Sequence, residues 1–256
     1  MYIVAVRYMR QDLSVLEGSR MSLKSDVRVI VLDIDRTLCS LTHGVGSIYH
    51  ELLRARGIES DRGVLEAEVQ RVWGSFHDIY LNTTEQYRTT HEREREVWLE
   101  FVRRVCAAAN LSCGSDPVVV ESIYNAFATR AYRRVEEGAM EFLLRVREQG
   151  RMVVAASNND ARSKLMLEEL GLHHYLAHIF VAGDLGWKKP SPHFYATLAA
   201  RLHLEPSNIL HVGNDRELDV EAAKRAGLTA IHYAPRGEAA EAGVTSFKEL
   251  TALVGL

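Results

Sequence analysis

The sequence predicts an α/β fold: a Rossmann-like parallel sheet flanked by helices, into which an all-helical domain is inserted. Residues 27–34 form an apolar, β-branched run with little alternation, which is typical of a strand buried on both faces. After residue 137, short apolar runs alternate with helical patterns, as expected for βαβ units and a parallel sheet. Between these two regions lie about a hundred residues with helical periodicity and almost no strand-like run.

The expected elements follow one another along the chain. Four helices of the insertion are predicted at residues 47–56, 61–80, 84–110 and 117–133. The remaining strands are predicted at residues 152–157, 178–181, 208–212 and 229–233, with helices at 140–148, 161–170, 193–202 and 218–226. Three of these helices are followed by a glycine, which favours the left-handed conformation at a helix end: Gly150, Gly171 and Gly227.

The pattern divides the chain of 256 residues into a core and an insertion. Residues 22–40 and 135–256 are predicted to form the α/β core domain, and residues 41–134 the helical domain. Residues 1–21 are an N-terminal extension of undefined structure, with a possible short strand at residues 2–6. We expect a flexible join at residues 42–46, where two glycines allow the backbone to change direction.

Composition excludes several classes of protein. Hydrophobic residues make up 47% and charged residues 25%, which is ordinary for a globular chain and excludes a disordered or collagen-like one. No apolar run approaches the ~20 residues that span a bilayer. A net charge of −3 lacks the basic excess with which nucleic-acid binders neutralise phosphates. We therefore expect a small-molecule partner, no nucleic acid and no membrane. Three scattered cysteines fit the reducing cytoplasm: Cys39, Cys106 and Cys113.

Polar side chains gather where the predicted strands end, and parallel α/β sheets bind ligands at this edge. The four groups are Asp33 with Asp35, Ser157 with Asn158, Lys188 with Lys189, and Asn214 with Asp215 and Asp219. Taken singly, the carboxylates and the serine also suit helix N-termini, and adjacent lysines suit a charged loop. The order of the groups, each at the end of a successive strand, favours one shared cleft.

These groups resemble the four motifs of the haloacid dehalogenase-like hydrolases. Residues 33–38 (DIDRTL) are similar to the first motif, Asp-x-Asp-x-Thr-Leu, and residues 153–158 to the second, an apolar strand ending in Ser/Thr-Asn. Residues 186–192 resemble the third, in which the lysine directly before proline is functional. Residues 211–227 are similar to the fourth. The helical insertion between the first two motifs resembles the cap of this family, which closes over the cleft and selects the substrate.

The resemblance implies a phosphatase that hydrolyses a small phosphorylated metabolite through an aspartyl-phosphate. Asp33 is then the nucleophile, and Asp35 protonates the leaving alcohol and afterwards deprotonates the attacking water. Ser157 binds a phosphoryl oxygen, and Lys189 places a positive charge against Asp33 and the phosphate. We expect three further residues to contribute to substrate binding: Arg36, Thr37 and Asn158.

The resemblance also implies a bound Mg²⁺, which prefers oxygen ligands and keeps several waters. Its expected ligands are the side chains of Asp33 and Asp215, the main-chain carbonyl of Asp35, and an oxygen from Asn214. Two positions depart from the family pattern. Arg36 stands where glycine is frequent, and Asn214 stands where aspartate is common, so we assign the direct carboxylate ligand to Asp215.

A 2-haloacid dehalogenase, a sugar phosphomutase and a non-catalytic binding module are the alternatives on the same fold. Dehalogenation requires neither a leaving-group acid nor a metal, so Asp35 and Asp215 favour the phosphatase. The insertion contains no lysine. This disfavours a phosphonate hydrolase that uses a Schiff-base lysine of the cap, and it leaves a sugar phosphomutase without a cap lysine for a second phosphate. Asn214 alone points toward a non-catalytic protein.

Two patterns within the insertion have simpler interpretations than a substrate site. Arginines alternate with glutamates at residues 92–96, which indicates a solvated, salt-bridged helix face. Trp73, Phe76 and Tyr80 recur at helical spacing, and we expect them in the apolar core of the insertion.

Overall fold

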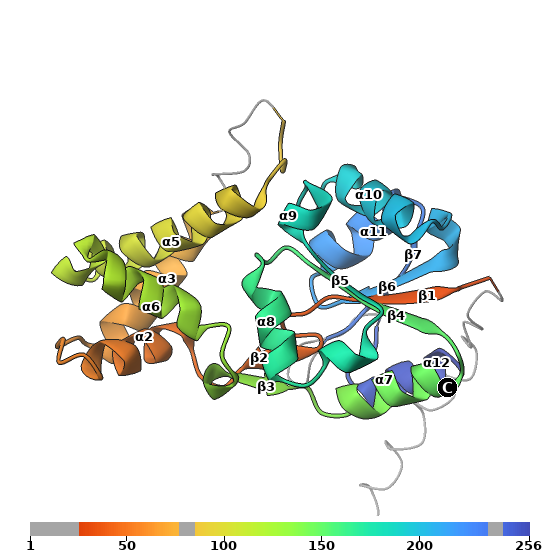
Figure 1. Ribbon diagram of the computed structural model, residues 1–256, viewed down its shortest axis with the longest axis horizontal. Helices are drawn as coiled ribbons and strands as arrows, with labels where there is room; N and C mark the ends of the chain where they lie inside the picture. Colours follow the sequence, from red (N-terminus) through yellow and green to blue (C-terminus); the bar gives the residue numbers. More distant parts are fainter. Residues whose placement is uncertain (1–25, 77–84, 235–242) are drawn as a thin grey trace, which may run out of the picture.

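The computed structural model describes residues 26–76, 85–234 and 243–256 (Figure 1). Its centre is a five-stranded, wholly parallel sheet with the strand order β5-β4-β1-β6-β7. The strands are β1 (Val29–Leu32), β4 (Met152–Ser157), β5 (His178–Val181), β6 (Ile209–Gly213) and β7 (Thr229–His232). The predicted α/β class is confirmed.

Strand β1 lies in the middle of the sheet and is fully buried. Ile30 and Leu32 point into one apolar cluster, while Val29 and Val31 point into another on the opposite face. The first face is covered by α7 (Ala139–Glu148), α8 (Arg162–Glu169) and α12 (Phe247–Leu253). The second is covered by α10 (Pro192–Leu202) and α11 (Ala222–Arg225). Because helices cover both faces, a continuous apolar run replaces alternation in this strand.

The helices between residues 45 and 126 form a separate bundle beside the sheet (Figure 1). Its members are α2 (Val45–Arg54), α3 (Arg62–Phe76), α5 (His91–Ala108), the 3₁₀ turn η1 (Ser112–Ser115) and α6 (Pro117–Ala126). They surround an apolar cluster of their own, in which Leu53, Leu65, Val105 and Ile123 are fully buried. The boundaries at residues 41 and 134 stay a prediction.

A short antiparallel ribbon joins the bundle to the sheet. The chain enters the bundle through β2 (Cys39–Leu41) and leaves through the 3₁₀ turn η2 (Arg130–Tyr132) and β3 (Arg133–Val135). Cys39 is paired with Val135 and Leu41 with Arg133. Both connections therefore run side by side, close to the end of β1.

The sequence predicted the strands of the large sheet within two residues, but the bounds of several helices were wrong. Residues 127–133 do not continue the α-helix: α6 ends at Ala126, and the 3₁₀ turn η2 and then β3 follow. Helix α5 begins at His91, because the Thr90 hydroxyl accepts a hydrogen bond from the Arg93 amide and caps the helix there. Residues 1–21 and 77–84 lie outside the described residues. Gly150, Gly171 and Gly227 adopt positive φ as predicted.

The predicted join at residues 42–46 also needs correction. Gly46 lies inside α2 and is buried. A Cβ atom at this position would lie 2.4 Å from the main-chain nitrogen of Glu66, so glycine is needed for α2 and α3 to pack closely. None of the described helices is long and apolar enough to cross a bilayer.

The remaining short elements lie in the connections between β4, β5, β6 and β7. They are the 3₁₀ turns η3 (His173–Tyr175) and η4 (Pro206–Asn208), the short helix α9 (Ala182–Leu185) and the π-helix η5 (Arg216–Glu221). The helix predicted at residues 218–226 therefore begins as the π-helix η5 and continues as α11.

Candidate active site

Two buried carboxylates share one buried ammonium at the carboxyl ends of β1 and β6. Lys189 Nζ lies 2.7 Å from Asp33 Oδ1 and 2.6 Å from Asp219 Oδ1. Asp219 also accepts the Asp215 amide at 3.0 Å, and His211 Nε2 lies 3.1 Å from its Oδ1. Three of the four motif segments predicted to converge, the first, the third and the fourth, are therefore in contact.

Burial governs the protonation of this cluster. It raises the pKa of Asp33 from 3.8 to about 7, because Lys189 offsets only part of the desolvation and the Asp219 carboxylate adds repulsion. Burial also favours the neutral form of Asp219, but Lys189 and His211 outweigh it and lower the pKa of that carboxyl. The two carboxylates in turn overcome desolvation and raise the pKa of Lys189.

Gly213 ends β6 directly behind this cluster. A Cβ atom there would lie 2.3 Å from the Asp219 carboxyl group. Only glycine therefore lets the strand end pack against Asp219 while that carboxylate contacts Lys189.

Asp35 is held by two residues that the sequence analysis did not identify. Arg133 forms an ion pair with Oδ1, and the Asn159 side-chain amide donates a hydrogen bond to Oδ2 at 2.5 Å. Arg133 Nε also donates to the Phe127 carbonyl at 3.0 Å. Asn159 directly follows Ser157 and Asn158, so its position beside the second motif could have identified it as a site residue. The position of Arg133 could not, because its segment was predicted to be helical.

Ser157 and Asn158 follow β4 and have different surroundings. Ser157 is buried and its hydroxyl accepts the Asn159 amide at 3.3 Å. Since α8 begins only at Arg162, Ser157 does not cap that helix. The Asn158 side chain accepts the Lys189 amide at 2.7 Å and donates to the Lys189 carbonyl at 3.0 Å. Asn158 thereby fixes the main chain of Lys189, a role that the sequence prediction did not include.

Lys188 is buried rather than part of a charged surface loop. Its ammonium lies 2.6 Å from Glu94 Oε2 on α5 and donates to the Asn158 carbonyl at 2.8 Å. Glu94 is completely buried and also accepts the Thr89 hydroxyl at 2.5 Å. The expectation of a solvated helix face at residues 92–96 is therefore wrong for Glu94.

The other predicted residues of the first motif line the turn after β1. Thr37 is fully buried, and its hydroxyl has no hydrogen-bond partner among the residues that the structure describes. Arg36 is exposed and has a φ of 59°, a left-handed conformation that glycine adopts without strain. The turn geometry thus explains why glycine suits this position.

The fourth motif supplies Asp215 and Asn214 at the end of β6. Asp215 Oδ1 accepts the amides of Glu217 at 3.0 Å and Leu218 at 2.8 Å, so this carboxylate caps η5. The main-chain carbonyl of Asn214 lies 2.9 Å from His232 Nε2.

The donor atoms around Asp33 fit Mg²⁺. No group of three His, Cys, Asp or Glu side chains arranged for a metal occurs within the described part of the chain. Mg²⁺, however, needs only one or two carboxylates beside carbonyls and waters. Neither Asp33 Oδ2 nor the Asp35 carbonyl accepts a hydrogen bond from the described residues. These are hard oxygen donors of the kind that Mg²⁺ binds.

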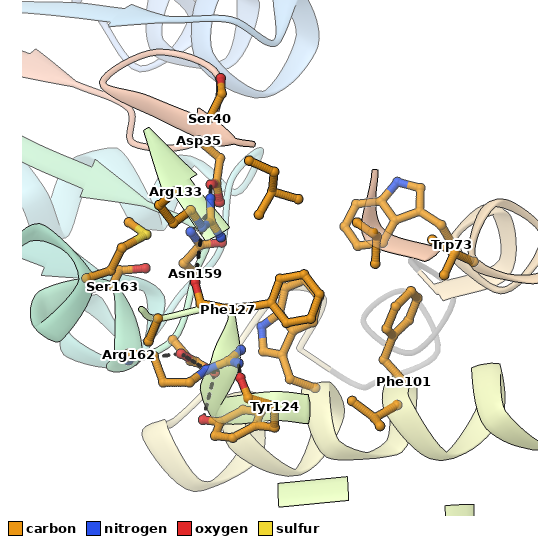
Figure 2. Close-up of a pocket in the computed structure, with 18 of the residues that line it drawn as sticks. Asp35, Ser40, Trp73, Phe101, Tyr124, Phe127, Arg133, Asn159, Arg162 and Ser163 are labelled. Atoms are coloured by element: carbon orange, nitrogen blue, oxygen red, sulfur yellow. Dashed lines mark hydrogen bonds and ion pairs between the residues drawn. The ribbon is translucent and has the colours of Figure 1, made fainter. Parts of the chain in front are cut away.

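A cavity of about 550 Å³ extends from Asp35 to the helical bundle. Figure 2 shows Asp35, Arg133 and Asn159 on one side and Trp73 and Phe101 across from them. Phe76 is buried in the bundle as predicted, but Trp73 lines this cavity. Tyr80 lies outside the described residues.

Residues 27–227 match the haloacid dehalogenase-like hydrolase family, and the chain belongs to it. The protein is therefore a hydrolase of this class. Its solved structural neighbours include a defluorinating L-2-haloacid dehalogenase, with a TM-score of 0.73, 15% identity and coverage of 90% of this chain and 96% of that one. A phosphatase of the family from Thermococcus onnurineus has a TM-score of 0.59 and 18% identity, over 90% and 98% of the two chains. At such identities these neighbours show the fold.

Similar sequences include human haloacid dehalogenase-like hydrolase domain-containing protein 3, which is 25% identical over 81% of this chain and 82% of its own. A glyceraldehyde 3-phosphate phosphatase from Methanopyrus kandleri is 24% identical over 80% and 83% of the two chains. A phosphoserine phosphatase from Thermus thermophilus is 24% identical over 80% and 88%. Phosphatases are thus among the relatives.

Proposed function

We propose that this protein is a Mg²⁺-dependent phosphomonoester hydrolase that acts on a small phosphorylated molecule through an aspartyl-phosphate. The observation that carries the proposal is the pairing of Asp33 with Lys189, 2.7 Å apart, in a site that also presents a second carboxylate at Asp35. The phosphatases among the similar sequences support it.

In this mechanism Asp33 attacks phosphorus, and the bond from phosphorus to the alcohol oxygen breaks. Lys189 neutralises charge as the anionic nucleophile approaches the anionic phosphate. Asp35 gives its proton to the leaving alcohol oxygen and then takes one from the water that attacks the aspartyl-phosphate. Arg133 and Asn159 hold the Asp35 carboxyl group in place. Ser157 and Thr37 supply hydroxyls beside the reacting phosphoryl group.

A bound Mg²⁺ would supply further positive charge to offset the negative charge of the phosphoryl group. The proposed ligands are the Asp33 carboxylate, the Asp35 carbonyl, and side-chain oxygens of Asp215 and Asn214. We further propose that the helical bundle is the cap of the enzyme. The three buried, free cysteines fit a cytoplasmic protein.

Phosphate release from p-nitrophenyl phosphate, with and without Mg²⁺, tests this function. We expect Asp33→Asn to reduce the rate about 1,000-fold or more, since the amide cannot act as nucleophile. Chelation of Mg²⁺ by EDTA should have a comparable effect that added Mg²⁺ reverses. The matched control is Asp26→Asn, a carboxyl that lies before β1 and is exposed. Full activity of a folded Asp33→Asn variant excludes the mechanism.

The dehalogenase alternative rests on fold similarity to a 2-haloacid dehalogenase and uses the same nucleophile. It differs in its need for Asp35, because halide leaves as an anion and accepts no proton. Chloride release from L-2-chloropropionate therefore discriminates the two. A dehalogenase retains chloride release in Asp35→Asn, whereas a phosphatase loses phosphate release in the same variant and releases no chloride in the wild type.

A further inference from the structure

The cavity beside Asp35 has two chemically different walls. The wall from the sheet side carries the charged and polar side chains of Asp35, Arg36, Ser40, Arg133, Asn159, Asp160, Arg162 and Ser163. Eleven other lining residues come from strand β2 or from the helical bundle. Apart from Gln70 they are apolar or aromatic: Leu41, Val45, Tyr49, Val69, Gln70, Trp73, Trp98, Phe101, Val102, Tyr124 and Phe127.

The apolar wall contains a packed group of aromatic rings. Trp73 stacks on Trp98 with ring centroids 5.9 Å apart, and Phe101 contacts both rings edge-on. Phe76 lies behind them, 4.8 Å from the Phe101 ring centre. Trp73 nevertheless remains 42% exposed. An exposed indole that is held rigidly by neighbouring rings is a surface to which a flat or branched apolar group binds with little loss of entropy.

Two of the three arginines that line the cavity are matched by carboxylates. Arg133 is paired with Asp35. Arg162 is paired with Asp160 at 2.9 Å, and its guanidinium lies 3.4 Å from the centre of the Tyr124 ring. The Tyr124 hydroxyl in turn donates to Asp160 at 2.9 Å. These groups therefore satisfy one another. Among the described lining residues, the bundle side offers no charge to a second phosphate, an ammonium or a carboxylate of a ligand.

We propose that this cavity binds the alcohol part of the substrate and selects phosphate monoesters of apolar alcohols, in particular those with an aromatic ring. The inference rests on the proposed phosphatase function, because Asp35 at one end of the cavity is the expected proton donor to the alcohol oxygen. A phosphate at Asp33 places the alcohol beside Asp35, and the rest of the molecule extends toward Trp73. Multiply charged esters find no charged partner among the described residues of the apolar wall.

Two esters with similar leaving groups test the selection. 3-Phenylpropyl phosphate and sn-glycerol 3-phosphate are both primary alkyl phosphates, so a difference between them reports recognition of the alcohol. With Mg²⁺ present, we expect kcat/KM for the phenylpropyl ester to be about tenfold higher or more. Trp73→Ala should reduce that ratio about tenfold, with little change for the glycerol ester. Val64→Ala, an exposed apolar residue on the same helix α3 but outside the cavity, should leave the ratio unchanged.

Equal or better hydrolysis of the glycerol ester overturns the selection while leaving the phosphatase proposal intact. If neither ester is hydrolysed, the phosphatase proposal fails, and calorimetric binding then decides the cavity inference. Asp33→Asn should bind 3-phenylpropyl phosphate about tenfold more tightly than inorganic phosphate, and equal affinities overturn the inference. Trp98→Phe replaces Trp73→Ala if that variant does not fold. A Trp73→Ala variant that changes only self-association places Trp73 in an interface of two copies and also overturns it.

Discussion

Lys189 determines the charge balance of the site because its ammonium is the shared partner of Asp33 and Asp219. Lys189→Gln leaves two buried carboxylates facing each other without a cation. Removing one partner from a buried ionic cluster typically costs about 3–5 kcal/mol, since the remaining charge stays desolvated. We expect a loss of this size in the free energy of unfolding measured with urea at neutral pH.

Lys164→Gln is the control for that experiment. Lys164 pairs with Asp184 at 2.9 Å, but its side chain is 43% exposed, so about 0–1 kcal/mol is expected. If the two variants lose the same stability, the Lys189 cluster does not carry the buried charges described above.

The raised pKa of Asp33 gives a pH dependence of stability. The folded carboxyl titrates at about 7 and the ordinary carboxyl at 3.8, so the folded protein holds a proton that the unfolded chain releases first. The stability that this bound proton adds to the folded state is fully present below about pH 4 and is lost as pH rises through 7. In metal-free buffer, Asp33→Asn should therefore gain melting temperature relative to wild type between about pH 5 and pH 8, by a few degrees. Exposed Glu59→Gln should show no such gain, and a pH-independent difference for Asp33→Asn contradicts the assignment.

The site residues that the sequence predicted are chemically reactive or charged residues that follow a recognisable apolar strand. Asp33 and Lys189 follow strands whose apolar pattern is unmistakable, and the structure brings them together. Arg133 and Glu94 could not be found in this way, because their roles arise from contacts with residues far away in the chain. A guanidinium or carboxylate in a charged segment looks the same whether it is solvated or buried against a distant partner.

At the scale of elements, the ribbon of β2 and β3 links the helical bundle to the proposed acid. Its strands have three residues each, too few to show the period of two that identifies a strand. They form because the two chain connections pair with each other, a tertiary effect that no local pattern announces. The ribbon then places Arg133 against Asp35.

Arg133→Gln tests whether the ribbon positions Asp35. The variant removes the ion pair, and we expect the misplaced acid to matter most where the leaving group needs a proton. kcat for an alkyl phosphate should fall about 10–100-fold, while kcat for p-nitrophenyl phosphate, whose leaving group is a stable anion, should fall far less. The exposed neighbour Arg134→Gln is the control. Equal losses with both esters indicate that Arg133 has only a structural role.

At the scale of the whole molecule, the bundle and the sheet are joined by polar contacts rather than by a common apolar core. The cluster within the bundle shares no residue with the two clusters of the sheet among the described residues. The contacts between them include the Lys188–Glu94 ion pair, the Tyr124–Asp160 hydrogen bond and the Thr89 amide bound to the Gly186 carbonyl at 2.9 Å. Polar contacts of this kind allow two parts to open separately, which suits a cap over a catalytic core.

Hydrogen exchange of two matched variants tests this division. Leu53 in the bundle and Leu210 on β6 are both fully buried, so replacement by alanine leaves a cavity and costs about 2–5 kcal/mol in either place. We expect Leu53→Ala to raise amide exchange across α2, α3, α5 and α6, with β1, β4 and β6 protected as in wild type. Leu210→Ala should raise exchange in the strands instead. A uniform rise over the bundle and the sheet in the Leu53→Ala variant means that they unfold as one cooperative unit, because a local cavity can spread its effect only through energetic coupling.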